Sequence, residues 1–375
     1  MGEKILVTGG AGFIGSFLVD ALVERGQDVR IYDALVPQVH GPEQAPPPYL
    51  NATAELVVGD VRDRDSLARA LEGVDVVYHL AAAVGVGQSM YQIQYYTDMN
   101  SLGGAVLLDI LANAKHHVRK IVVASSMSIY GEGKYECDEH GIVYPRLRSE
   151  DQLKARQWEM RCPHCQREVQ PLPTDEDKPL YPTSIYAITK RDHEEMFLST
   201  GVAYGIPAVA LRFFNTYGPR QALSNPYTGV MAIFSGRLLN QQPPIIYEDG
   251  QQSRDFIHVR DIVQGLLLAM ERPEADYQVF NLGTGVPTSV LEIAEMLSEH
   301  LTGGEIKPEI RNQFRAGDIR HCYSDVTAAR RLLGFEPSIS LADGLEDLLA
   351  WVREQSAEDR FDQVERELAT KSLVV

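Results

Sequence analysis

Apolar residues in the first third of the chain form short, nearly continuous runs that alternate with stretches of helical spacing. The runs predict five strands, at positions 5–8, 28–32, 55–59, 74–80 and 120–125. The helical spacing predicts helices over residues 17–24, 65–71 and 101–113. Strands that are apolar along their length are typical of a parallel sheet with both faces covered. Right-handed crossovers between such strands give a doubly wound α/β fold.

Residues 134–178 break this alternation. The segment is polar, rich in Arg, Glu and Pro, and shows no clear strand. A loop of this length without structure of its own is uncommon inside a compact domain. We therefore expect something other than a hydrophobic core to organise it.

After Tyr186 the alternation resumes, with a predicted helix to about Ser199 and a strand over residues 208–213. The pattern then becomes mixed and rich in turns, which predicts a smaller C-terminal α+β lobe over about 216–355. The last stretch, 356–375, is charged, and we expect this tail to fray.

Composition and charge narrow the class of protein. The 375 residues are 44% hydrophobic and 23% charged, which is a globular composition. The formal net charge of −17 repels phosphate backbones and argues against general nucleic-acid binding. No apolar run is long enough to span a membrane, and the start leaves no room for a signal peptide. We therefore expect no membrane partner. Because four cysteines are too few for a disulfide scaffold, we also expect a cytoplasmic protein.

A glycine-rich turn lies between the first predicted strand and the first predicted helix. Gly9 allows a tight turn, Gly12 lets the backbone approach a pyrophosphate, and Gly15 lets the helix pack on the strand. Asp33 ends the second strand about 20 residues later, where a carboxylate binds an adenosine ribose. This pattern predicts a Rossmann dinucleotide site, and the Asp favours NAD over NADP because it repels a 2′-phosphate.

Two further segments follow strands of the predicted sheet. Asp60 and Val61 could bond to adenine and pack against it, although a simple strand-end turn explains them equally well. Leu80, Ala81 and Ala82 let a backbone pass close to a dinucleotide, although a tight core strand is the simpler interpretation.

Candidate catalytic groups occur at Tyr186 and Lys190, four residues apart at the start of a predicted helix. This spacing puts the phenol and the ammonium on one face. A nearby ammonium, together with a positively charged nicotinamide, favours the phenolate, which could accept a proton from a sugar hydroxyl. The strand over 120–125 ends in a cluster of serines that includes Ser126 and Ser128, whose hydroxyls can bridge to a sugar oxygen.

Together these motifs resemble the extended short-chain dehydrogenase/reductases that act on nucleotide sugars, the NAD-dependent epimerase/dehydratase family. Four more segments match: His79-Leu80-Ala81-Ala82, Arg212 to Asn215, Arg254 to Val259 and Asn281 to Gly285. The resemblance extends from residue 4 to about 350 and is interrupted mainly by residues 134–178.

The resemblance implies roles for individual residues. It implies that the catalytic residues are Ser126, Tyr186 and Lys190. It implies that the residues contacting NAD, besides those of the glycine turn and strand ends above, are Phe13, Ile14, Asn100, Phe213, Tyr186 and Lys190. It implies that the residues contacting a nucleotide sugar are Asn215, Val230, Tyr247, Arg254, Arg315 and Asp318, with both arginines on the diphosphate and Asp318 on a ribose. A homodimer formed through two helices is also expected from the resemblance.

The two residues after Ser126 indicate the reaction. Family members share oxidation of a sugar hydroxyl, and the resemblance implies an acidic residue after the catalytic hydroxyl residue in dehydratases and decarboxylases. This chain has Met127-Ser128 there, which favours a 4-epimerase that forms a transient 4-keto sugar and returns the hydride to the opposite face. Val84, Gly85 and Val86 suit a small apolar pocket in which the sugar can turn over. A decarboxylase or dehydratase of the same family, or a non-catalytic NAD-binding regulatory protein, is the alternative.

Four candidate metal ligands lie within residues 134–178. Cys137 and His140 form one pair, and Cys162 and Cys165 form another. Two such pairs supply the four N/S ligands of a closed tetrahedral zinc site, which would explain how a polar segment folds. The alternative is two turns with free thiols, and His164 could replace one ligand. An insert at this place resembles bacterial family members of the dTDP-rhamnose 4-epimerase type, whereas a UDP-hexose is the other substrate considered.

These interpretations divide the chain into four parts. We expect residues 1–133 and 179–215 to form the NAD-binding Rossmann domain and 134–178 to form a zinc-knuckle-like insert. We expect 216–355 to form mainly the nucleotide-sugar lobe, followed by a tail over 356–375.

Overall fold

The computed structural model of the chain describes residues 2–315, 317–371 and 373–374. Its largest element is a seven-stranded parallel sheet of order β3-β2-β1-β4-β5-β9-β13. The strands are β1 (Lys4–Thr8), β2 (Asp28–Asp33), β3 (Glu55–Val58), β4 (Val76–His79), β5 (Lys120–Ser126), β9 (Ala208–Phe213) and β13 (Val279–Leu282). The order reverses between β1 and β4, and this is where doubly wound sheets bind ligands. The predicted parallel α/β sheet is confirmed.

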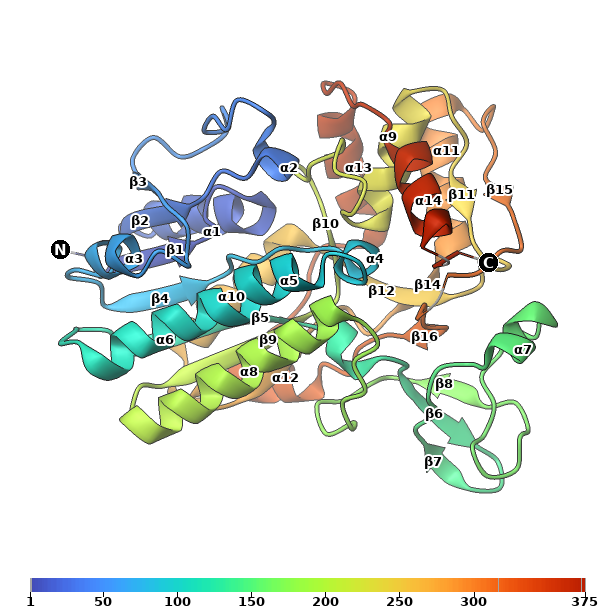
Figure 1. Cartoon of the computed structure of the whole chain (residues 1–375), viewed down its shortest axis with the longest axis horizontal. Helices are drawn as coiled ribbons and strands as arrows, with labels where there is room; N and C mark the ends of the chain where they lie inside the picture. Colours follow the sequence, from blue (N-terminus) through green and yellow to red (C-terminus); the bar gives the residue numbers. More distant parts are fainter. Residues whose placement is uncertain (1, 316, 372, 375) are drawn as a thin grey trace.

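Helices cover both faces of this sheet (Figure 1). One face packs on α1 (Phe13–Glu24), α10 (Val259–Glu271) and α12 (Thr327–Leu333). The other face packs on α3 (Arg64–Ala70), α6 (Gly103–Asn113) and α8 (Ile185–Tyr204). Along β1, Ile5 and Val7 point to the first core and Leu6 to the second, and all three are fully buried. Burial on both faces explains why the strands read as continuous apolar runs.

The helix boundaries differ from the predicted ones where glycine weakens the periodic pattern. Helix α1 begins at Phe13 rather than Phe17, because Gly12 caps it and the Gly15 turn is already helical. A π-helical segment, η1 (Thr97–Leu102), precedes α6. Helix α8 continues past Ser199 and ends only at Gly205, which has left-handed backbone angles.

A smaller α+β region follows β9, as predicted. Its strands are β10 (Asn215–Tyr217), β12 (Ser253–His258), β14 (Pro287–Ser289) and β16 (His321–Cys322), with a separate pair β11 (Ile245–Ile246) and β15 (Glu309–Ile310). Its helices are α9 (Val230–Leu239), α11 (Val290–Thr302) and α13 (Leu341–Val352). They share a core that includes Phe234, Leu297 and Leu348. The same stretch of chain also returns β13, α10 and α12 to the large sheet.

The prediction that residues 134–178 contain no strand is wrong. An antiparallel sheet of order β7-β6-β8 forms there from β6 (Lys134–Cys137), β7 (Gly141–Val143) and β8 (Gln170–Leu172), and the short helix α7 (Glu150–Lys154) follows β7. The strands are three or four residues long, and exposed polar residues such as Glu136 interrupt their pattern. Figure 1 shows this insert at the end of the molecule that carries β14 and β16.

The predicted fraying of the tail is also wrong for residues 361–370, and residues 372 and 375 lie outside the described part of the chain. Helix α14 (Phe361–Thr370) packs Val364 and Leu368 against the molecule. Glu367 accepts hydrogen bonds from the hydroxyls of Tyr91 and Tyr227, both at 2.9 Å. Although the segment is rich in charged residues, it forms an amphipathic helix, and this helix places Glu367 against the two tyrosines. The remaining short elements are α2 (Pro37–His40), α4 (Val86–Ser89), α5 (Ile93–Tyr96), η2 (Met127–Tyr130) and η3 (Pro273–Ala275).

Candidate active site

A cavity of about 700 Å³ opens beyond the carboxyl ends of β1, β4, β5 and β9. The predicted cofactor residues that line it are Gly9, Gly12, Phe13, Ile14, Gly15, Asp33, Val61, Leu80, Ala81, Ala82, Tyr186, Lys190 and Phe213. The predicted substrate residues that line it are Val84, Ser126, Tyr186, Asn215 and Val230. The cavity therefore joins most of the predicted cofactor residues to one part of the predicted substrate site.

The glycine turn leaves no space for a side chain. Gly9 has a φ of +71°, and a Cβ added to it would lie 2.8 Å from the backbone nitrogen of Ala81. Gly12 is the N-cap of α1 and offers no side-chain cap, so the first backbone N–H groups of the helix face the cavity end of the turn. A helix N-terminus of this kind binds a pyrophosphate. The turn thus fits a dinucleotide.

Asp33 ends β2 at the wall of the cavity. Its Oδ2 accepts the backbone N–H of Ala11 at 3.0 Å, and its Oδ1 accepts that of Leu35 at 2.9 Å. These bonds fix the carboxylate between the glycine turn and the following loop, with lone pairs left for ribose hydroxyls. The loop itself lines the cavity with Pro46 to Tyr49 and His40, which the sequence analysis missed. In the sequence, only the run of prolines from Pro46 to Pro48 marks this segment, and such a run indicates a loop rather than the wall of a cavity.

Tyr186 and Lys190 lie at the start of α8, on the face turned to β5. The hydroxyl of Ser184 caps the helix by accepting the N–H of Ala187, and Ser89 accepts the N–H of Tyr186 at 3.0 Å. Lys190 Nζ donates to the carbonyl of Ala124 at 2.9 Å, which places the ammonium beside the end of β5. The i, i+4 spacing therefore brings both groups to one face, as predicted.

The two serines that end β5 differ in their partners. The Ser125 hydroxyl donates to Glu194 Oε2 at 2.9 Å, and Glu194 in turn pairs with Arg212. Ser126 instead lies on the cavity wall with Tyr186 and lowers the pKa of its phenol, and its Oγ accepts the Ser128 hydroxyl at 2.9 Å. Only Ser126 thus remains directed at the candidate catalytic phenol.

Burial dominates the electrostatics of this pair. It raises the pKa of Tyr186 to about 12, while the Ser126 hydroxyl acts in the opposite direction. Burial also lowers the pKa of Lys190 to about 7. Without a bound cofactor, burial therefore keeps the phenol protonated at neutral pH.

Several predicted residues lie outside the cavity wall. The carboxylate of Asp60 is occupied by Arg62, which contacts it at 2.6 and 2.9 Å. Asn100 accepts the N–H of Ala83 at 2.7 Å and donates to its carbonyl at 3.1 Å, so it fixes the backbone after β4. Gly85, Val86 and Ser128 lie next to lining residues without lining the cavity themselves.

A second group of predicted substrate residues gathers near β12 and β16, also outside the cavity wall. Arg315 pairs with Asp318 at 2.8 Å, and its guanidinium lies 4.7 Å from the ring centre of Tyr247. Arg254 donates to the carbonyls of Ile319 and Arg320 at 2.7 and 2.9 Å. The structure brings these four predicted residues together around one segment, 315–320.

Two polar side chains of the cavity lack partners. Among the described residues, none donates a hydrogen bond to the buried Oδ1 of Asn215 or to the buried Oε1 of Gln221. Both residues line the cavity, and buried polar atoms normally have partners. A ligand with hydroxyl or N–H donors fits here. The sequence analysis missed Gln221 and Trp351 on this wall, because no motif includes them.

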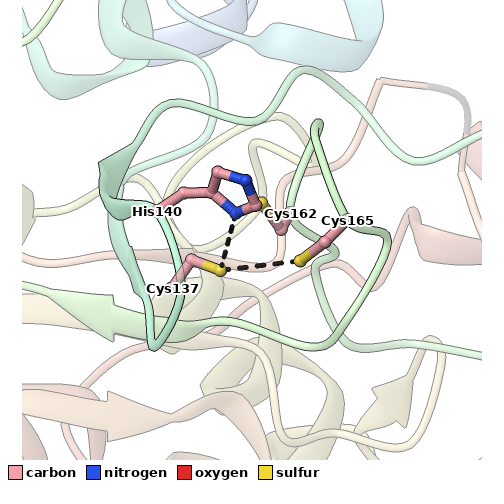
Figure 2. Close-up of side chains that lie close together, drawn as sticks. All are labelled: Cys137, His140, Cys162 and Cys165. Carbon is pink, nitrogen blue, oxygen red and sulfur yellow. Dashed lines mark hydrogen bonds between the residues drawn. The ribbon is translucent and has the colours of Figure 1, made fainter.

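The four predicted metal ligands meet in the insert (Figure 2). Their ligand atoms all lie within 4.8 Å of one another. Cys137 Sγ lies 3.6 Å from His140 Nδ1 and 3.7 Å from Cys165 Sγ, and Cys162 Sγ lies 3.7 Å from the same nitrogen. Ligands about 2.3 Å from a tetrahedral zinc lie roughly 3.8 Å apart, so the donor set fits such an ion.

The sheet, the glycine turn and the Tyr–Lys pair define a dinucleotide-binding α/β protein. Residues 5–149 match the NAD dependent epimerase/dehydratase family, and residues 168–348 match the family described as GDP-mannose 4,6 dehydratase. A dTDP-L-rhamnose 4-epimerase of Burkholderia thailandensis is 35% identical over 94% of this chain and 96% of its own. The chain belongs to the NAD dependent epimerase/dehydratase family.

Solved structures give the same result. A UDP-glucose 4-epimerase of Thermotoga maritima, solved with UDP-glucose, is 31% identical with a TM-score of 0.74, covering 94% of this chain and 99% of its own. A UDP-glucuronic acid 4-epimerase of Bacillus cereus, solved with UDP-glucuronic acid and NAD, is 28% identical with a TM-score of 0.75 and the same coverage.

The relatives also include a different reaction. A UDP-N-acetyl-alpha-D-glucosaminuronate decarboxylase of Bacillus cytotoxicus is 27% identical over 94% of this chain and 99% of its own.

Within the described part of the chain, no helix combines the length and the apolar character needed to cross a bilayer.

Proposed function

We propose that the protein is an NAD-dependent nucleotide-sugar 4-epimerase. The observation that supports this most strongly is that Tyr186, Ser126 and Lys190 line the same cavity as the glycine turn and Asn215. A dinucleotide held at Gly9–Gly15 and Asp33 would supply a reversible hydride acceptor for C4 of the sugar. The chain would then supply binding, orientation and proton transfer.

The proton would move between the sugar and Tyr186. Ser126 orients the phenol and can share a hydrogen bond with the O4 hydroxyl of the sugar. Lys190, fixed on the carbonyl of Ala124, holds positive charge beside the site when protonated and so favours the phenolate. The phenolate would accept the O4 proton as the C4 hydride leaves, and return it when the hydride returns.

Epimerisation is favoured over dehydration or decarboxylation by the distribution of acids. Asp33 is the only carboxylate among the described residues that line the cavity, and it belongs to the cofactor end. Met127 and Ser128 follow Ser126, so no acid is available next to the sugar to expel a leaving group. The 4-keto sugar can then only turn over and be reduced from the other face.

Turning over requires one end of the substrate to be held and the other to be free. Arg254, Arg315 and Asp318 suit the diphosphate and ribose, because guanidinium groups bind phosphate through two parallel hydrogen bonds. Val84, on the cavity wall, and the neighbouring Gly85 offer the sugar few polar partners. We propose a dTDP-rhamnose-type or UDP-hexose-type substrate.

The test is a panel of UDP-, dTDP- and GDP-sugars incubated with the protein, with products analysed by NMR. The expected result is interconversion of two C4 epimers for at least one sugar, without net consumption of NAD and without loss of water or carbon dioxide. A product that has lost either would favour the dehydratase or decarboxylase. Identical behaviour of the wild type and Tyr186→Phe would favour a regulatory protein.

We also propose that Cys137, His140, Cys162 and Cys165 bind one structural zinc ion. Three thiolates and one imidazole close the coordination shell, so no position is left for a substrate. Metal analysis of the purified protein should find about one zinc per chain. Recovery of fully folded, metal-free protein with four titratable thiols would contradict this site.

A further inference from the structure

We infer that the insert, residues 134–178, positions the nucleotide-binding half of the substrate site through the buried side chain of Arg148. This inference rests on the proposed function, because it concerns the residues expected to hold the nucleoside diphosphate. Among the described residues that line the cavity, none comes from the insert. Its influence must therefore pass through the residues that it contacts.

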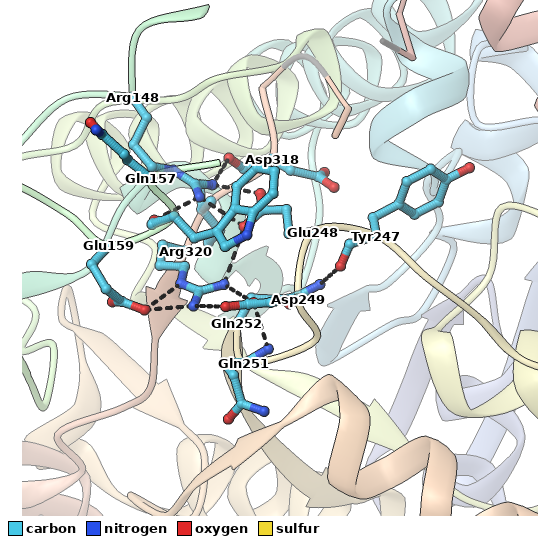
Figure 3. A network of polar contacts seen from close by, with 12 residues as sticks. Arg148, Gln157, Glu159, Tyr247, Glu248, Asp249, Gln251, Gln252, Asp318 and Arg320 are labelled. Atoms are coloured by element: carbon cyan, nitrogen blue, oxygen red, sulfur yellow. Dashed lines mark hydrogen bonds and ion pairs between the residues drawn. The ribbon is translucent and has the colours of Figure 1, made fainter. Parts of the chain in front are cut away.

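Arg148 forms a bidentate ion pair with Glu248, a residue of the C-terminal region. Nη1 lies 2.8 Å from Oε2 and Nη2 lies 2.8 Å from Oε1, and the two side chains are only 1% and 3% exposed. Nη2 also donates to the carbonyl of Asp318 at 3.2 Å, and Nη1 donates to that of Trp158 at 2.9 Å. One guanidinium thus joins the insert to two segments that carry predicted nucleotide contacts (Figure 3).

Glu248 has an unusual backbone. Its φ is +56°, in the left-handed region that residues other than glycine and asparagine rarely adopt. It directly follows Tyr247, whose ring lies beside the guanidinium of Arg315. A strained residue persists only where its surroundings hold it, and such residues concentrate at functional sites. The ion pair with Arg148 contributes to that restraint, together with Arg320 Nη1, which lies 3.2 Å from Oε2 of Glu248, so we infer that the direction of Tyr247 depends on the insert.

Glu159 provides a second connection from the insert. It contacts Arg320 at 2.5 and 3.1 Å and His321 at 3.1 Å. Arg320, fully buried, also contacts Asp249 at 2.7 and 2.9 Å, so the turn over 247–249 and the segment 318–321 are fixed to each other. Figure 3 shows the two arginines side by side between these segments.

The turn over 247–249 and the segment 318–321, which the insert contacts, lie beside or carry the proposed nucleotide contacts. Arg315 and Asp318 pair at the start of the second segment, and Arg254 donates to the carbonyls of Ile319 and Arg320 in its middle. Release of the segment at Asp318 or Glu248 would therefore displace the groups that hold the ribose and the diphosphate. The glycine turn and Asp33 lie on the cavity wall, to which no described residue of the insert contributes, so NAD binding should not change.

The proposed metal site lies close in sequence to the residues of the insert that make these contacts. Trp158 and Glu159 lie three to four residues before Cys162, and the Met160 carbonyl accepts the N–H of Val169 across the knuckle. Ordering of the Cys/His cluster would thereby fix the position of Glu159 and of the carbonyl that Arg148 contacts.

The test compares Arg148→Met with the double variant Arg148→Met/Glu248→Met in the full-length protein. Removing one member of a buried pair leaves an unpaired charge, whereas replacing both members by apolar residues often restores stability. Binding of UDP, dTDP, GDP and NAD is measured by calorimetry, and the thermal midpoint is recorded. Lys154→Met, on exposed α7 of the same insert, is the matched control.

The expected result is that both variants bind the preferred nucleoside diphosphate about tenfold more weakly or worse, because a small misplacement of binding groups has effects of this size. NAD affinity should be unchanged, and KM for the nucleotide sugar should rise while kcat changes less than about twofold. The double variant should regain the thermal midpoint but not the nucleotide affinity. The control should match the wild type.

Wild-type nucleotide affinity in a folded double variant would overturn the inference and leave the pair a purely structural one. If the single variant does not fold, the double variant and Glu159→Gln, which keeps its size, still decide the question. Failure of the wild-type protein to bind any of the three nucleotides would instead contradict the proposed function.

Discussion

The seven-stranded sheet and the insert are organised by different forces. The sheet buries apolar residues on both faces, with Ile5, Leu6 and Val7 of β1 fully enclosed. The described part of the insert contributes to two small clusters of buried residues. One includes two candidate metal ligands, Cys137 and Cys162, and the other joins Leu153 and Trp158 to Phe314. Elsewhere the insert depends on ion pairs such as Arg148–Glu248. The stability of the first region is thus spread over many apolar contacts, whereas that of the second depends on fewer discrete ones.

This difference separates two tasks. The proposed catalytic residues, Ser126, Tyr186 and Lys190, come from β5 and α8, which are fixed by the large core. Groups proposed to hold the nucleotide lie on short strands and turns, and the insert restrains them from outside. Variants in the sheet should therefore affect chemistry or NAD binding, and variants in the insert should affect nucleotide binding.

The largest effect is expected for Tyr186→Phe. Loss of the phenol removes the proton acceptor, and kcat should fall roughly a thousandfold, within the range of positioned acid–base groups. NAD affinity and zinc content should not change, because the ring remains in place. Rates are measured by following epimer formation. Tyr204→Phe, an exposed position on the same helix, is the control. A Tyr186→Phe enzyme within tenfold of wild type would place the chemistry elsewhere.

Cys162→Ser should unfold the insert locally and leave the seven-stranded sheet folded. The zinc content should drop to near zero, and proteolysis should occur first within residues 134–178, because the metal stabilises a segment with little core of its own. The nucleotide dissociation constant should rise about tenfold, as for a lost supporting contact. Cys322→Ala is the control, since this buried cysteine lies outside the cluster. Equal zinc content in the two variants would exclude the proposed ligand set.

Asp33→Asn should change the opposite half of the site. The carboxylate would lose its charge, and NAD should bind about tenfold more weakly, because hydrogen bonds to a charged acceptor are stronger than neutral ones. Nucleoside diphosphate binding should stay at the wild-type level. Calorimetry with each ligand gives both numbers, and Asp28→Asn at the exposed start of the same strand is the comparison. Parallel loss of both affinities would show that the two halves are not independent.

The smallest effect is expected in stability. Lys190 has a pKa of about 7 in the folded protein because of burial, compared with about 10.5 when unfolded. Below pH 7 both states are protonated and the folded state bears the full cost of a buried ammonium. This cost disappears as the pH rises through the window from 7 to 10.5. Lys190→Met should therefore be more stable than the wild type below pH 7.

The measurement is a series of denaturant titrations across that window. The stability advantage of Lys190→Met should shrink as pH rises, while activity is lost at every pH. An advantage that is independent of pH would show that Lys190 does not titrate in the folded state. Arg148, by contrast, has a carboxylate partner, so its replacement alone should destabilise the protein.

Local patterns were sufficient for most of the first region. The strands of the sheet are continuous apolar runs. The glycine turn is a short motif, within which the residues lie a few positions apart, and the same holds for the pair Tyr186 and Lys190. The Cys/His cluster was also predicted, because its two pairs each have a short spacing. These features need no knowledge of how distant segments meet.

Contacts between distant segments could not be predicted. Arg148 and Glu248 are 100 residues apart, and neither belongs to a motif. The strands of the insert are too short for period-two alternation to be distinct from chance. Helix α14 was missed because two buried residues, Val364 and Leu368, are surrounded by charged ones. The burial that raises the pKa of Tyr186 cannot be predicted from a spacing in the sequence.

The most direct test of the proposed reaction uses a nucleotide sugar that interconverts in the substrate panel, labelled with deuterium at C4. Because Tyr186 moves only the O4 proton and the C4 hydrogen never reaches water, the epimerised product should keep its deuterium at C4 in ordinary buffer. The label is measured by NMR in both epimers. Replacement of the deuterium by solvent hydrogen at the rate of epimerisation would contradict the proposed mechanism.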